Sequence, residues 1–174
     1  MAEFKDSPAS SDDISTPPLP MPGKSVRMVY EFLFTIFTLI TAPFYLRKMK
    51  KRGNWKEGFS ERFGDYSSKL KQALTNRDIL WFHAVSVGEV NLCSHLVDFV
   101  QREAPNLKIV ISTTTSTGMQ LLRDRFPVGI EKIYYPIDRR RYVRSAFATL
   151  RPRAIILVEA EIWPNLIWQA RRQR

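Results

Sequence analysis

The segment ILWFHAVSVGE, residues 79–89, decides the fold of this chain of 174 residues. Residues 79–85 form a continuous apolar run, which is typical of a strand buried on both faces, and residues 90–100 then show helical periodicity. The same alternation recurs downstream. Apolar runs predict strands at 107–112, 132–135 and 154–158, and helices are expected near 117–125, over 139–150 and from Pro164. This alternation predicts right-handed βαβ units on a parallel sheet, so the fold class is α/β, half of a doubly wound architecture.

The first strand end carries Ser86, Gly88 and Glu89, and ligands of doubly wound folds bind beyond the carboxyl ends of strands. Ser86 and Glu89 have the spacing of a capping box, in which the serine caps the helix and the glutamate returns to a backbone N–H. Alternatively, Glu89 accepts a proton from a substrate hydroxyl, beside a glycine that allows a ligand to approach closely. The two roles coexist only if one carboxylate oxygen stays free.

The second strand ends in STTTSTG, residues 112–118, where Ser116, Thr117 and Gly118 open a helix. Hydroxyls and backbone N–H groups at a helix N-terminus can hold an anion or a sugar, although an ordinary N-cap turn explains most of this segment. The fourth strand is followed by Glu159 and Glu161, two residues apart and on the same side of an extended backbone. They are either site carboxylates or structural partners of basic residues such as Arg151 and Arg153.

The basic run 139–141, together with Arg144, is either a solvated helix face with Asp138 as its N-cap or a group that grips phosphate. The net charge of the chain is +10, and residues 1–23 carry −3 of it, so the remainder is strongly basic. Such a surface favours anionic partners. Nucleic acid is not expected, because no base-stacking or groove-reading motif is present. Cys93 falls in an apolar helical pattern and is expected to be a small buried hydrophobe, and one cysteine with two histidines shows no spacing for a zinc site.

The N-terminal third divides into two segments. Residues 1–23 are rich in Ser, Pro and Asp and predict a disordered tail. Residues 24–52 contain the apolar stretch MVYEFLFTIFTLITAPFYL (28–46) and a basic flank that favours anionic lipid. Pro43 is expected to kink or end the helix, and a more polar stripe follows helical spacing: Glu31, Thr35, Thr38, Ala42 and Tyr45. The helix is expected to attach to a membrane, either as a single span or lying in the interface, rather than to be a buried core helix.

Several strings together resemble the 3-deoxy-D-manno-octulosonic acid (Kdo) transferases. Residues 82–89, FHAVSVGE, look like the family signature H-x-x-S-V-G-E, and residues 111–118, ISTTTSTG, are similar to its T-T-x-T-x-T-G segment. Residues 151–167 resemble P-x-x-x-x-x-x-E-x-E-x-W-P-N-L-I closely, and YPID at 135–138 matches Y-x-P-x-D loosely. The apolar helix and ERFG, residues 61–64, also look like the N-terminal region of the family, so that the resemblance covers roughly residues 28–172.

The resemblance implies a GT-B glycosyltransferase, in which a Rossmann-like N-terminal half, here residues 53–174, binds the lipid acceptor and a C-terminal half binds CMP-Kdo. By this resemblance Glu89 is the general base, Glu159 supports the transition state, and Glu161 has a supporting role. Ser86, Gly88, Ser116, Thr117 and Gly118 are expected to bind the acceptor or support the site. No metal or other cofactor is expected.

The partners implied are a lipid A precursor, CMP-Kdo and an anionic membrane, at the cytoplasmic face of the inner membrane. The sequence stops at Arg174, without a donor domain, so we expect this chain alone to be inactive. The alternative is a non-catalytic membrane-surface protein that binds anionic lipid.

Overall fold

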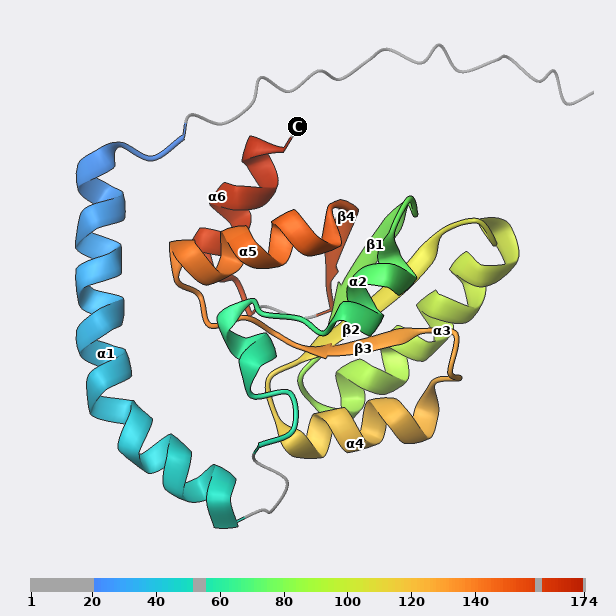
Figure 1. Cartoon of the computed structure of the whole chain (residues 1–174), viewed down its shortest axis with the longest axis horizontal. Helices are drawn as coiled ribbons and strands as arrows, with labels where there is room; N and C mark the ends of the chain where they lie inside the picture. The colour runs from blue at the N-terminus through green and yellow to red at the C-terminus, as the bar shows by residue number, and fades with distance from the viewer. Residues whose placement is uncertain (1–20, 52–55, 159–160, 174) are drawn as a thin grey trace, which may run out of the picture.

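A parallel four-stranded sheet forms the centre of the computed structural model, which describes residues 21–51, 56–158 and 161–173 (Figure 1). Its strands are β1 (Ile79–His83), β2 (Lys108–Thr113), β3 (Glu131–Tyr134) and β4 (Pro152–Leu157), in the order β3-β2-β1-β4. All three neighbouring pairs are parallel. The predicted α/β class and all four predicted strands are confirmed.

Helices cover both faces of the sheet, and each face packs against its helices to form one of two apolar cores. Because side chains alternate along a strand, Ile79 and Trp81 face one core while Leu80 and Phe82 face the other. The first core includes residues of α2 (Ser68–Leu74), α5 (Arg140–Leu150) and α6 (Pro164–Arg172). The second includes residues of α3 (Val87–Glu103) and α4 (Ser116–Arg125). β1 is buried along its whole length, whereas β4, at an edge of the sheet, is only partly buried.

Two short elements between the N-terminal helix and the sheet were not predicted, the 3₁₀ helix η1 (Ser60–Phe63) and α2. The αL residue Gly64 ends η1, with φ of 72°. A side chain at this position would place its Cβ 2.5 Å from the carbonyl oxygen of Tyr142, so the approach of η1 to α5 requires glycine.

The N-terminal helix α1 (Lys24–Lys51) is long and apolar enough to cross a membrane, judged by length and composition. It does not end at Pro43, although its C-terminal part changes direction in Figure 1. Most of its large apolar side chains are exposed, and Met49 is its buried residue. The alternative of a buried core helix is therefore wrong. The predicted disordered tail falls almost wholly on residues 1–20, outside the described residues.

Candidate functional site

Glu89 lies at the start of α3 and makes the predicted capping box with Ser86. The Glu89 N–H donates to Ser86 Oγ (3.2 Å), and Glu89 Oε1 accepts the Ser86 N–H (3.2 Å). Glu89 Oε2 accepts a further N–H, that of Val85, at 2.7 Å. Neither oxygen is therefore without a partner, contrary to the condition set for a second role. Each carboxylate oxygen has two lone-pair directions, so an additional donor can still be accepted.

A hollow of about 370 Å³ lies between the turn after β1 and the start of α4. Ser86, Thr117 and Gly118 line it, so the first two strand ends meet at one place, as predicted from the topology. Gly88 is exposed, and a Cβ built there would have only Ser86 Oγ nearby, at 3.9 Å. Open space at Gly88 leaves room for a ligand against the backbone.

Gly118 is required where the start of α4 packs against the end of β2. A Cβ at this position would lie 2.3 Å from Thr113 Oγ1, a buried hydroxyl at the end of β2 that has no hydrogen-bond partner in the described part of the chain. The cap of α4 is Thr115, whose side chain accepts the Gly118 N–H at 3.0 Å. Ser116 and Thr117 open the helix and do not cap it. The N-cap explanation of this segment is confirmed.

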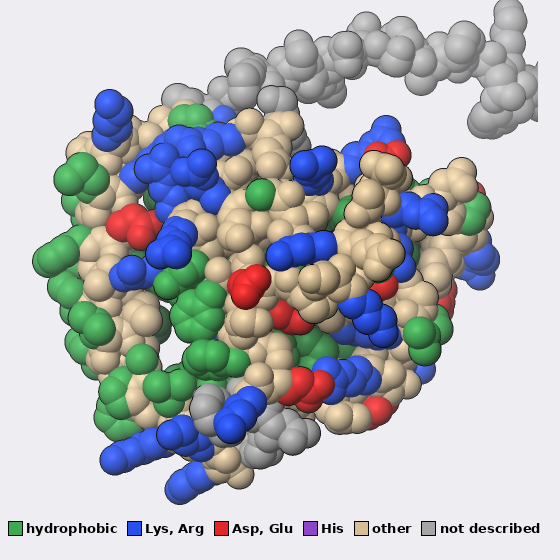
Figure 2. Space-filling model, in the orientation of Figure 1, with side chains coloured by type: hydrophobic (Ala, Val, Ile, Leu, Met, Phe, Trp, Pro, Cys, Tyr) green, Lys and Arg blue, Asp and Glu red, His purple; other side chains and the backbone are tan. Residues whose placement is uncertain are grey.

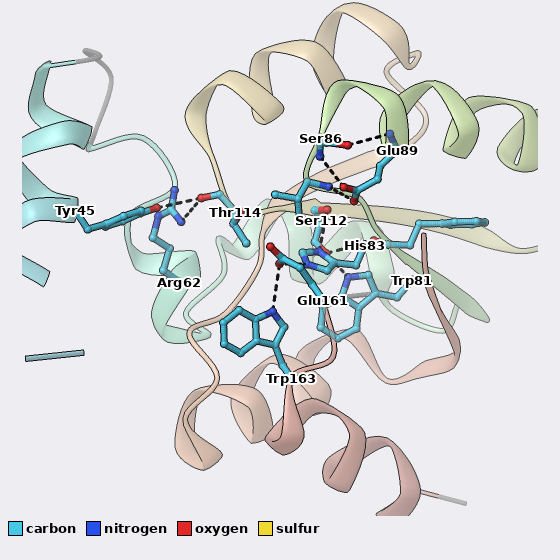
Figure 3. A network of polar contacts seen from close by, with 12 residues as sticks. Tyr45, Arg62, Trp81, His83, Ser86, Glu89, Ser112, Thr114, Glu161 and Trp163 are labelled. Atoms are coloured by element: carbon cyan, nitrogen blue, oxygen red, sulfur yellow. Dashed lines mark hydrogen bonds and ion pairs between the residues drawn. The ribbon is translucent and has the colours of Figure 1, made fainter. Parts of the chain in front are cut away.

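Glu161 lies beside His83, the last residue of β1 (Figure 3). Glu161 Oε2 is 3.4 Å from His83 Nε2 and accepts the indole N–H of Trp163 at 3.3 Å. The hydrogen bond with His83 lowers the pKa of the Glu161 carboxyl, against a smaller opposing effect of burial. In the described part of the chain Glu161 pairs with His83 and not with Arg151 or Arg153, the basic partners suggested from the sequence, and Arg153 pairs with Asp78. Glu159 lies outside the described residues.

The other ring nitrogen of His83 is held by β2. His83 Nδ1 lies 2.9 Å from Ser112 Oγ and 3.2 Å from the Ser112 carbonyl oxygen. A carbonyl oxygen only accepts, so the contact with the Ser112 carbonyl is a hydrogen bond when Nδ1 carries the hydrogen. Ser112 Oγ also accepts the Trp81 indole N–H at 2.8 Å, and Tyr135 stacks on the imidazole at 4.2 Å between ring centroids. Two buried residues from the ends of β2 and β3, Ser112 and Tyr135, therefore fix the position of His83.

Asp138 does not cap the helix that follows it. The N-cap of α5 is Arg139, without a side-chain hydrogen bond. The buried Asp138 carboxylate accepts the backbone N–H groups of Asn165 and Leu166, both at 3.0 Å, and thereby caps α6. Burial raises the pKa of Asp138, and these hydrogen bonds oppose that rise. Asp138 was correctly predicted to cap a helix, but the helix was wrong. The sequence places Asp138 next to α5 and does not show that α6 packs against it.

The ERFG segment joins η1 to two strand ends. Glu61 Oε2 accepts the Tyr134 N–H at 2.7 Å, and burial raises the pKa of this carboxyl. Arg62 is buried and donates to the Thr114 carbonyl oxygen at 2.7 Å (Figure 3). Its guanidinium also lies over the Tyr134 ring, 4.2 Å from the ring centroid. These contacts hold the loop after β2 against the end of β3.

His83, Ser112 and Arg62 were missed as site residues. His83 is the last residue of β1 and Ser112 the second-last residue of β2, and they are register partners across the two strands. The sequence did contain a signal for these two residues, because each is a polar residue directly after an apolar run, and the two runs form adjacent strands. Cys93 is buried, as predicted, and burial raises the pKa of its thiol to about 12.

Comparison of the sequence with those of known proteins identifies a family to which the chain belongs. A family profile described as 3-deoxy-D-manno-octulosonic-acid transferase matches residues 57–174. The chain is 29% identical over 147 residues to a 3-deoxy-D-manno-octulosonic acid transferase of Chlamydia pneumoniae, covering 84% of this chain and 33% of the relative. It is 29% identical over 145 residues to the enzyme of that name in Haemophilus influenzae, covering 81% and 33%. A probable mitochondrial enzyme of that name in Arabidopsis thaliana is 30% identical over 125 residues, covering 72% and 26%. The chain thus spans about a third of the length of the first two relatives.

Proposed function

Because the chain belongs to the 3-deoxy-D-manno-octulosonic acid transferase family, we propose that it is the acceptor-binding half of a GT-B glycosyltransferase. The reaction transfers Kdo from CMP-Kdo to a lipid A precursor in lipopolysaccharide biosynthesis. The observation that carries this proposal is the convergence of the motif segments. Ser86 and Glu89 after β1, Thr117 and Gly118 after β2, and Glu161 after β4 all lie at the carboxyl edge of one parallel sheet.

Glu89 acts as the general base in this proposal. Its carboxylate takes the proton of the acceptor sugar hydroxyl as that oxygen bonds to the anomeric carbon of Kdo, and the bond from that carbon to the CMP phosphate breaks. Two backbone N–H groups hold the carboxylate in one orientation. Each oxygen keeps a second lone pair that can accept the substrate proton.

Glu159 and Glu161 have distinct proposed roles. Glu159 supports the transition state, while Glu161, which His83 contacts, has a supporting role. Ser86, Gly88, Ser116, Thr117 and Gly118 shape the acceptor side of the crevice.

The proposed division of the molecule is a tail at 1–23, a membrane-attaching segment at 24–52 and the acceptor domain at 53–174. CMP-Kdo is bound by a second half that corresponds to the remaining length of the relatives, and transfer requires both halves. We place the protein on the cytoplasmic face of the inner membrane, where its acceptor and CMP-Kdo meet.

The test is Kdo transfer from CMP-Kdo to a tetraacylated lipid A precursor, by this chain alone and with the donor half of a full-length relative. We expect transfer only by the mixture, and Glu89→Gln lowers it at least 100-fold, about the contribution of a general base. Glu103→Gln, at the exposed far end of the same helix, is the matched control. Transfer by the chain alone contradicts the need for a second half. Unchanged transfer by Glu89→Gln contradicts the role of Glu89.

A second candidate is a non-catalytic protein that binds anionic lipid, favoured by the exposed apolar face of α1. It predicts vesicle binding without transfer, even when the supplied donor half is folded and active with its own acceptor half.

A further inference from the structure

One face of α1 is fastened to the α/β domain by polar side chains. Tyr30 Oη donates to Asp138 at 2.7 Å, and Tyr45 Oη donates to the Thr114 carbonyl oxygen at 3.1 Å. Between them, Glu31 Oε1 accepts the Arg140 N–H (3.1 Å) and the Asn165 side-chain amide (2.8 Å). Residues 30 to 45 span about 22 Å of helix, so the attachment runs along most of its length.

Further contacts follow the same stripe of the helix. Arg139 donates to Thr35, and Phe34 packs edge-on against Trp163 at 6.2 Å between ring centroids. Met49, one turn beyond Tyr45, is buried. The polar stripe noted in the sequence therefore faces protein.

The opposite stripe is apolar and faces outward. Its large exposed side chains are Val29, Phe32, Leu33, Ile36, Phe37, Ile40 and Phe44, each between 41 and 72% exposed. The hydroxyl beside this stripe, that of Thr41, donates to the Phe37 carbonyl of the helix itself. This stripe therefore presents no hydroxyl in need of water, and Figure 2 shows it as a green band along one side of the molecule.

Cationic side chains flank this band at both ends (Figure 2). At the N-terminal end, a hollow of about 700 Å³ is lined by Lys24, Arg27, Arg140 and Arg172, beside Trp168. The structure gives these four cations no ion pair among the described residues, and the Nε of Arg27 is buried without a hydrogen-bond partner there. Arg47, Lys48 and Lys51 lie at the other end.

We propose that α1 lies flat in the interface of an anionic bilayer, its apolar stripe among the acyl chains, and that the arginine cluster of Arg27, Arg140 and Arg172 binds lipid phosphates. A spanning orientation requires the helix to leave the domain or carries Asp138, Arg139 and Asn165 into hydrocarbon with it. An apolar stripe flanked by cations fits one occupant, a negatively charged lipid surface. This inference deepens the proposed membrane attachment and holds whether or not the chain takes part in Kdo transfer.

The arrangement also fixes where the crevice lies. α1 contacts Thr114 after β2, Asp138 after β3 and Asn165 after β4. A helix held in the interface therefore keeps the carboxyl edge of the sheet at the lipid surface. If the proposed function holds, an acceptor lipid reaches the crevice without leaving the bilayer.

Depth measurements distinguish the two orientations. A spin label is attached to a single cysteine at Val29, Ile36 or Phe44 in a Cys93→Ala chain, and its exposure to oxygen and to a polar nickel chelate is measured on phosphatidylglycerol-containing vesicles. We expect the three labels to lie at nearly the same depth. In a spanning helix, Ile36 lies about 10 Å deeper than either of the others, since each residue rises 1.5 Å. A label at Asp98 on α3 is the control and remains in water.

Three outcomes would contradict the interfacial orientation of α1. A maximum at Ile36 shows a span, three labels in water show no membrane contact, and labels shielded from both reagents show that protein, such as a second copy, covers the stripe. Kdo transfer is measured separately, so these outcomes do not depend on the proposed function.

The phosphate site has its own test. We expect Arg140→Gln with Arg172→Gln to weaken binding to phosphatidylglycerol vesicles about tenfold and to leave binding to phosphatidylcholine vesicles unchanged. Arg77→Gln with Arg102→Gln removes the same charge from exposed positions elsewhere. Equal losses in the two double variants overturn the cluster as a specific phosphate site, because net charge alone then explains binding.

Discussion

The His83–Glu161 pair joins the end of β1 to the segment after β4, and it is the main cause of the pKa shift of Glu161. Its hydrogen bond to His83 lowers the pKa of the carboxyl, so folding is favoured by this group above its ordinary pKa near 4.5. That contribution is lost as the pH falls through the lowered folded pKa. Because 41% of the Glu161 side chain is exposed, the effect on stability is small, and direct titration is the better readout.

We expect the Glu161 carboxyl carbon, followed by NMR, to titrate below 4.5 in the parent chain. In His83→Gln the pKa rises toward the ordinary value, because the principal cause of the shift is removed. A titration of Glu161 that is identical in both chains contradicts the pairing.

Glycines at the two strand ends have different functions, and alanine substitution separates them. Gly118→Ala places a methyl group 2.3 Å from Thr113 Oγ1 and is expected to cost about 1–3 kcal/mol of unfolding free energy, measured with urea. Gly129→Ala, where a Cβ meets nothing within 4 Å, is the control and stays within about 0.5 kcal/mol. An equally stable Gly118→Ala chain contradicts the packing role.

Gly88→Ala is expected to leave stability unchanged or slightly raised, since the nearest atom to the new methyl group is 3.9 Å away and alanine favours helix. In the reconstituted transfer assay the same change raises the KM for the lipid acceptor if the substrate approaches the backbone at this point. A normal KM places the acceptor elsewhere in the crevice.

Among the elements, those with strong apolar periodicity were predictable and those held by tertiary contacts were not. The apolar run that begins with ILWFH predicted the strand β1, and the helical periodicity of residues 90–100 predicted the helix α3. The helix α2 has seven residues and was missed, although Leu70 and Leu74 have helical spacing and Ser67 caps it. Its stability comes from burying those leucines in the first core, which a short sequence pattern does not reveal.

The cap of α6 shows the same limit. Asp138 precedes α5 in sequence, so proximity suggested a cap for that helix, but its carboxylate caps a helix that begins at Pro164. Likewise Glu161 was identified from its motif, whereas its partner His83 lies 78 residues away and became visible only through the pairing of β1 with β4.

Removal of the Asp138 carboxylate tests this long-range cap. Asp138→Ala leaves the first N–H groups of α6 without their acceptor and Tyr30 without its partner, which we expect to cost about 2–4 kcal/mol of unfolding free energy. Asp98→Ala, on the exposed side of α3, is the control. Tyr30→Phe removes only the contact with α1 and costs less. A cost no greater than that of Asp98→Ala contradicts the cap.

At the scale of the whole molecule, α1 and the α/β domain are stabilised differently. Both apolar cores are built from residues 66 onward, and neither contains a residue of α1. Apart from buried Met49, the contacts of α1 described above are hydrogen bonds and aromatic edges at the carboxyl edge of the sheet. The sequence predicted both parts and the polar stripe that joins them. The sequence could not show that the polar stripe of α1 faces the carboxyl edge of the sheet, because that edge forms only when the ends of β2, β3 and β4 come together in the fold.

A chain that begins at Lys56 is therefore expected to fold by itself. Its circular dichroism retains mixed α/β content and its urea unfolding remains cooperative, because the two cores are intact. Stability falls by about 1–3 kcal/mol, since Asp138 loses the Tyr30 hydroxyl and Asn165 loses Glu31. Binding to anionic vesicles falls far more than stability, because the apolar stripe is removed. If the shortened chain unfolds without a cooperative transition, α1 is part of the folding unit itself, and its contacts at the edge of the sheet contribute more than hydrogen bonds exchanged for water.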